Sequence, residues 1–165
     1  MLKKTLPVAS IVFGLFLLTG CSSSGSLNYT KPASTPIELN KTVTLEVSGS
    51  AEPRITEQLR SDLFGRLVSE RIFTAVHHRE KPADYNLKII ILSSNTVSPV
   101  ARIMLGVLAG ANKLKVDVKI FETATGNLHS NFVVTGESAS HPMSSESGLE
   151  NAVREVVSNI INGLK

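Results

Sequence analysis

The alternation of apolar and polar residues along the chain predicts five β-strands. Residues 41–47 and 112–122 alternate with a period of two, which is typical of a strand with one buried face. Residues 84–94 are apolar on both faces in their middle, so we expect this strand at the centre of its sheet. A glycine-containing turn predicts a hairpin between the last two strands. The expected strands are residues 41–47, 73–78, 84–94, 112–122 and 128–137.

Two other stretches carry apolar residues at the spacing of an α-helix. The first begins near Pro53, a residue suited to a first helical turn, and the second follows the serine-rich residues 144–147. Their apolar positions are Ile55, Leu59, Leu63, Leu67, Val68 and Ile72, then Leu149, Val153, Val156, Val157, Ile160 and Leu164. The order of elements predicts one α+β domain over residues 38–165, with a mainly antiparallel sheet of about five strands covered by two helices.

The first twenty residues have the layout of an export signal. Lys3 and Lys4 precede the apolar residues 8–18, and small residues follow. This apolar run is shorter than the roughly 20 residues that a membrane-spanning helix needs. We therefore expect a cleaved signal peptide over residues 1–20.

The end of this segment, Leu18-Thr19-Gly20-Cys21, resembles the lipobox of bacterial lipoproteins. The resemblance implies cleavage between Gly20 and Cys21 and attachment of lipid to the Cys21 sulfur and the new amino terminus, so that acyl chains such as palmitate hold the protein on a membrane. In lipoproteins an Asp after the cysteine commonly causes retention at the inner membrane, and here that residue is Ser22, which favours the outer membrane. The alternative is an ordinary cleavage site with an incidental thiol.

Residues 21–37 are rich in Ser, Thr, Pro and Gly and contain few large apolar side chains. This composition predicts a flexible tether. Such a tether would let the domain hang clear of the lipid surface.

The net charge of the chain and the spacing of its histidines argue against nucleic-acid binding and metal binding. Removing residues 1–20 takes away two lysines and no acid, which lowers the formal net charge from +3 to +1, so nucleic acid is not an expected partner. His77 and His78 are adjacent on a strand and point to opposite faces, and neither His129 nor His141 has ligand spacing around it. We therefore expect no metal, no cofactor, no catalytic residue and no enzymatic activity.

Residues 98–113 are almost entirely apolar or small. Arg102 places a charge within this stretch, which argues against a membrane-spanning helix. Lys113 lies too far beyond the second glycine for the stretch to be a phosphate-binding loop. The favoured interpretation is a packed loop or short helix with glycines where backbone passes close to backbone. The alternative is an exposed interaction patch. The patch would consist of Ile103, Met104, Leu105, Val107 and Leu108.

The stretches SDLFGRLVSERIFTAV, ADYNLKIIIL and LGVLAGANKLKVDVKIFETATGN resemble successive blocks of a family of small bacterial envelope lipoproteins known only as a domain of unknown function. The resemblance implies an α/β lipoprotein domain and supplies no catalytic residues. We expect a lipid-anchored envelope lipoprotein, facing the periplasm from the outer membrane, that acts as a non-catalytic interaction or assembly module. Its partner would be an envelope protein or another copy of itself. The alternatives are a periplasmic module that binds a small ligand and, behind it, an enzyme.

Overall fold

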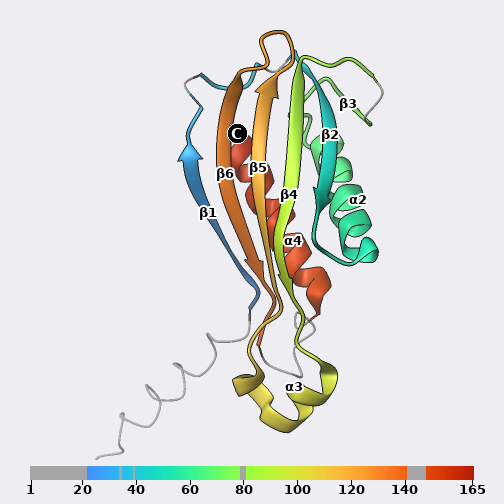
Figure 1. Ribbon diagram of the computed structural model, residues 1–165, viewed down its shortest axis with the longest axis vertical. Coiled ribbons are helices and arrows are strands. Elements are labelled where there is room, and N and C mark those ends of the chain that lie inside the picture. Colours follow the sequence, from blue (N-terminus) through green and yellow to red (C-terminus); the bar gives the residue numbers. More distant parts are fainter. Residues whose placement is uncertain (1–21, 34, 39, 79–80, 141–147) are drawn as a thin grey trace, which may run out of the picture.

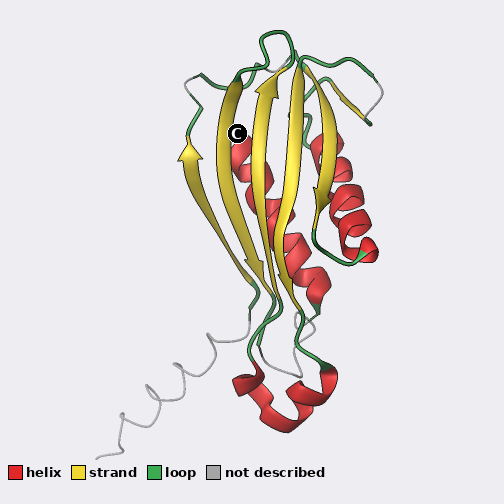
Figure 2. Cartoon of the chain, viewed as in Figure 1, coloured by secondary structure: helices red, strands yellow, loops and turns green. Residues whose placement is uncertain are grey.

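The computed structural model describes residues 22–33, 35–38, 40–78, 81–140 and 148–165. A six-stranded sheet is covered on one face by two long helices, α2 (Pro53–Ser69) and α4 (Leu149–Leu164), while a short helix, α3 (Pro99–Leu105), lies beyond one end of the sheet (Figures 1 and 2). The strands are β1 (Ser24–Lys31), β2 (Thr42–Gly49), β3 (Ala75–His77), β4 (Tyr85–Asn95), β5 (Lys113–Glu122) and β6 (Leu128–Glu137). The predicted α+β class is confirmed, with one strand and one helix more than expected.

The sheet mixes antiparallel and parallel pairs. Its order is β1-β6-β5-β4-β2-β3, and the four strands from β1 to β4 in this order are antiparallel neighbours. Strand β2 is parallel to both β4 and β3. Helix α2 supplies the crossover that a parallel β2–β3 pair requires. The prediction of a mainly antiparallel sheet did not include these parallel pairs. Strand β4 is central, as the apolar pattern predicted.

Strand β1 replaces part of the predicted flexible tether. Residues 24–31 pair with β6 in antiparallel register, from Ser24 opposite Glu137 to Lys31 opposite Asn131. The Tyr29 ring lies 5.4 Å from that of Phe132, and the Tyr29 hydroxyl donates a hydrogen bond to the Gly163 carbonyl oxygen at 3.2 Å. The tether prediction is wrong for these residues, because an edge strand is held by backbone hydrogen bonds that polar residues form as well as apolar ones.

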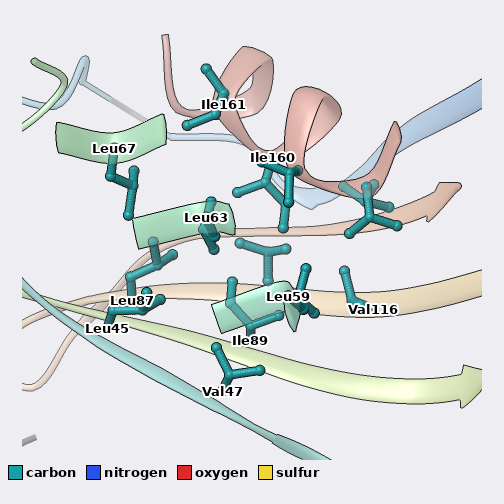
Figure 3. Packing of buried hydrophobic residues seen from close by; sticks show 14 of the residues in the cluster. Leu45, Val47, Leu59, Leu63, Leu67, Leu87, Ile89, Val116, Ile160 and Ile161 are labelled. Carbon is teal, nitrogen blue, oxygen red and sulfur yellow. The ribbon is translucent and has the colours of Figure 1, made fainter. Parts of the chain in front are cut away.

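The core lies between the helices and one face of the sheet (Figure 3). Leu59, Leu63 and Leu67 recur every four residues along α2 and are fully buried. They face Leu45 and Leu87 of the sheet, where side chains two apart share a face. Burying each such side chain contributes about 1.5–3 kcal/mol, so the helix–sheet contacts are a major source of the stability of the fold.

Helix α4 packs directly on the backbone of β6. A Cβ atom built at Gly136 would overlap the carbonyl oxygen of Ala152 and would lie 2.9 Å from the Val156 amide nitrogen. Because the nearest atom is a backbone oxygen, a movement of side chains alone cannot relieve the overlap. Gly136 therefore sets the distance between α4 and the sheet.

We predict that Gly136→Ala lowers the free energy of unfolding by about 1–3 kcal/mol, because the added methyl group overpacks the α4–β6 contact. The matched control is Gly65→Ala in α2, where a Cβ would meet no atom within 4 Å. Alanine there favours the helix and is expected to stabilise the protein by up to about 1 kcal/mol. Urea unfolding followed by circular dichroism measures both changes, and equal effects at the two sites would contradict the assignment.

Candidate functional site

The connection between β4 and β5 projects beyond the end of the sheet (Figure 1). It consists of α3 and a 3-10 helix, η2 (Gly106–Ala109), and we call residues 99–109 the apolar tip. Ser98 caps α3, since its Oγ accepts a hydrogen bond from the Ala101 amide at 3.1 Å, and Pro99 occupies the first helical turn.

The large apolar side chains of the tip are exposed. Ile103, Met104 and Leu108 retain 82%, 78% and 86% of their accessible surface, and Val100 and Leu105 are also exposed. Val107 lies in η2, but its side chain is outside the described part of the structure. Of the eight large apolar side chains that are exposed in the described residues, five belong to the tip. The segment forms a short helix, as the favoured interpretation allowed, but its large apolar side chains are exposed rather than packed.

The two glycines of this connection have a different role from the one predicted. No atom within 4 Å would meet a Cβ at Gly106 or Gly110, so neither allows a close backbone approach. Their φ angles are +57° and +83°, in the region that favours glycine. They turn the chain where α3 passes into η2 and where η2 returns to β5.

Arg102 is the only charged residue of the tip, and it points back into the protein. It is 8% exposed, and its Nη1 lies 3.5 Å from the Ala139 carbonyl oxygen. A surface helix normally turns its charges to water and its apolar side chains to the core. In α3 the charged side chain points inward and the apolar side chains point outward. This reversed orientation indicates that the outer side of α3 is suited to contact with an apolar partner rather than water. The sequence-based patch omitted both Arg102 and Val100.

The base of the tip is fixed by Asn112, which is 3% exposed. Its Oδ1 accepts a hydrogen bond from the Val97 amide at 2.7 Å, so one side chain joins the two ends of the connection. Its backbone amide donates to Ser138 Oγ at 3.0 Å, and its carbonyl accepts from the Ser138 amide at 2.9 Å. The tip is therefore held in place at the end of β6.

A recess of about 260 Å³ near the opposite end of the sheet is the alternative candidate for a site. The Tyr29 hydroxyl in it donates to Gly163, and Ser130 Oγ donates to the Lys31 carbonyl oxygen at 3.1 Å. His129 Nδ1 lies 3.4 Å from Glu122 Oε1, and its Nε2 is buried without a hydrogen-bond partner in the described residues. Because these polar groups bind within the protein or are shielded from solvent, they do not converge on a ligand.

The residues considered for metal binding lie apart. His78 stacks on Phe64 with ring centroids 4.9 Å apart, His129 lies in the recess, and His141 is outside the described residues. Within the described ranges, no group of three or more His, Cys, Asp or Glu side chains could hold a metal ion.

The perturbed titratable groups belong to structural contacts. Hydrogen bonds from the Thr42 amide and hydroxyl, both 2.8 Å, lower the pKa of Asp84, with Lys41 contributing at 3.7 Å. Burial raises the pKa of the neighbouring Tyr85. These contacts join the beginnings of β2 and β4, so the pKa shifts of Asp84 and Tyr85 reflect contacts that stabilise the fold.

Gly20 and Cys21, together with the rest of the expected signal peptide, lie outside the described residues. Within the part that is described, no helix combines the length and apolar character needed to cross a bilayer.

Comparison with known proteins decides the family. Residues 37–142 match the model of a domain of unknown function, DUF4410. The chain belongs to the DUF4410 family. The expected membership of a family of unknown function is thereby confirmed, and the apolar tip lies within the matched residues, whereas β1 and α4 lie outside them. No curated protein matches the sequence significantly.

Solved structures share the fold at low sequence identity. The PelC dodecamer from Paraburkholderia phytofirmans is 15% identical, with 85% of this chain and 98% of that chain covered and a TM-score of 0.62. Protein XCC0632 from Xanthomonas campestris, of family DUF330, is 11% identical over 79% of this chain and 87% of that chain, with a TM-score of 0.54. The hypothetical protein CT253 from Chlamydia trachomatis is 12% identical over 74% and 97%, respectively, with a TM-score of 0.51.

We predict that Asn112→Ala loosens the tip and lowers the free energy of unfolding by about 1–3 kcal/mol, because buried partners lose a hydrogen bond. Amide hydrogen exchange should become faster at Val97 and through α3. Asn127→Ala, in the exposed hairpin turn, is the control. Unchanged exchange at Val97 in the Asn112 variant would show that this side chain does not hold the tip.

Proposed function

We propose that this chain is a lipid-anchored bacterial envelope lipoprotein that acts as a non-catalytic interaction module, with the apolar tip as its interaction surface. The anchor is Cys21, and the protein faces the periplasm from the outer membrane. The observation that carries the proposal is the reversed orientation of α3, with Arg102 buried and Ile103 and Met104 exposed.

The energetic argument rests on the cost of leaving this surface in water. Moving one large apolar side chain out of water contributes about 1.5–3 kcal/mol, and the tip exposes five of them. Monomeric proteins seldom display a contiguous apolar patch without using it. A tip that is also held in place by Asn112 is suited to binding, because little conformational freedom is lost when a partner covers it.

Two observations support the interaction module over the alternatives. The polar groups of the recess near His129 are bound within the protein or shielded, which disfavours both a ligand site and an active site there. A second recess, of about 470 Å³, adjoins the tip through Arg102 and Ile103 and carries Glu52 and Glu150 on its wall. This recess carries charges of both signs, with Glu52 and Glu150 on its wall beside Arg54 and Arg102.

Assembly of several copies is a second form of the proposal. PelC from Paraburkholderia phytofirmans, which shares the fold, is described as a dodecamer. An assembly of this kind would place several anchors and several tips on one membrane.

The anchor is tested with labelled fatty acid in bacterial cells. Wild-type protein should incorporate the label, and Cys21→Ser should not, because only the thiol can accept the thioether lipid. Ser22→Asp should keep the label but move the protein to the inner-membrane fraction of a density gradient. Equal labelling of the wild-type and Cys21→Ser proteins would refute the anchor.

The interaction surface is tested by thiol accessibility in isolated envelope membranes. With Cys21 acylated, Met104→Cys supplies a single free thiol at the tip. We predict that this thiol reacts about tenfold more slowly with a water-soluble maleimide than the thiol of Ala124→Cys in the hairpin turn. The reason is that a tip covered by a partner in about nine molecules of ten can react only in the uncovered fraction. Wild-type protein gives the background. Equal rates at positions 104 and 124 would refute the tip as an interaction surface.

A further inference from the structure

The sheet register places the start of the described chain beside the apolar tip. Ser24 of β1 is paired with Glu137, Glu137 with Lys113, and Lys113 with Asn95. These four residues form one row across the sheet, at the end from which α3 projects (Figure 1). Neighbouring strands are about 4.8 Å apart, so Ser24 lies within roughly 15 Å of both the beginning and the end of the connection that carries the tip.

Chain length limits where Cys21 can lie. Three peptide units separate Cys21 from Ser24, and at about 3.8 Å per residue they reach no further than about 11 Å. Acyl chains on Cys21 would therefore enter a membrane close to the row of residues from which the tip projects. They could not do so at the opposite end, where the hairpin turn between β5 and β6 lies.

The chemistry of this end fits a lipid surface. Among the described side chains of the tip, the large apolar ones face outward and the one charged side chain, Arg102, is turned inward. Two ion pairs lie behind the tip: Lys113 Nζ lies 2.9 Å from Glu137 Oε1, and Arg54 Nη1 lies 3.5 Å from Glu150 Oε1. An apolar surface backed by a polar rim that carries such ion pairs matches the transition from hydrocarbon to headgroups.

We propose that the apolar tip inserts into the same bilayer leaflet that holds the Cys21 anchor, with Ile103, Met104 and Leu108 in contact with acyl chains. This inference rests on the proposed function, since it names the occupant of the proposed interaction surface. A second copy of the chain fits less well, because the anchor directs the tip towards the membrane and away from neighbours standing beside it. Insertion is shallow, since α3 and η2 are too short to span a bilayer.

The test uses the processed lipoprotein, purified in detergent and reconstituted into vesicles of phosphatidylcholine alone. Met104→Cys and, in a second protein, Leu108→Cys are labelled with an environment-sensitive fluorophore. We expect emission at shorter wavelength, strong quenching by a nitroxide on the lipid acyl chain, and weak quenching by iodide in the buffer. Because the rim charges are paired, vesicles containing phosphatidylglycerol should give the same result.

The matched control is Val68→Cys, which places the same label at an exposed apolar position of α2, beside Ala75 and therefore near the opposite end of the sheet. This label should be quenched by iodide and not by lipid nitroxide, which excludes insertion driven by the label itself. A label at 104 or 108 that is open to iodide overturns the inference. A label shielded from iodide yet unaffected by lipid nitroxide also overturns it and identifies another copy as the cover.

The two proposals fail in different experiments. If the thiol at position 104 is protected in envelope membranes but open to water in pure lipid vesicles, the interaction surface stands and its occupant is an envelope protein. If the thiol is open in both, the interaction surface itself is refuted.

Discussion

The packing of α2 and α4 against one face of the sheet is the constraint on which the rest of the molecule depends. The buried apolar side chains of β2, β4 and β5 face these helices, and a slip of one residue would turn them to the other face. The register fixed in this way aligns Ser24, Lys113 and Asn95 at one end of the sheet. The connection from β4 to β5 projects past the end of the sheet (Figure 1), where only the first turns of α2 and α4 adjoin it, so its large apolar side chains remain exposed.

Much of this architecture could be predicted because it depends on local periodicity. Strands β2, β4, β5 and β6 and helices α2 and α4 lie where the apolar pattern placed them, since each carries apolar residues at the spacing of its own secondary structure. Strand β1 could not be found in this way. Leu27 and Tyr29 are the only large apolar residues in its sequence, and it exists because β6 offers an edge of unpaired backbone groups. The parallel pairing of β2 with β4 likewise depends on distant residues that no local pattern connects.

For the apolar tip, amino-acid composition does not determine whether the side chains are buried or exposed. A packed loop and an exposed binding surface both contain large apolar residues such as Ile103, Met104, Leu105 and Leu108. The sequence could therefore identify the segment but not whether it is buried or exposed. The deciding feature is the direction of Arg102. A single charge among apolar residues can point to water or into the protein, and only the contacts of α3 with the strand ends determine which.

Finding β1 in the sheet also changes how the domain relates to a membrane. A flexible tether over residues 21–37 would hold the domain at a distance and leave its orientation free. With the sheet beginning at Ser24, a lipid on Cys21 would instead hold the domain directly against the membrane. A few exposed side chains bind a bilayer weakly on their own, but an anchor on Cys21, within about 11 Å of Ser24, makes their contact intramolecular and raises their effective concentration at the lipid surface. Two attachment points also restrict tilting and rotation, which one point cannot do. The far end of the sheet, with the hairpin turn between β5 and β6, would then be directed away from the membrane.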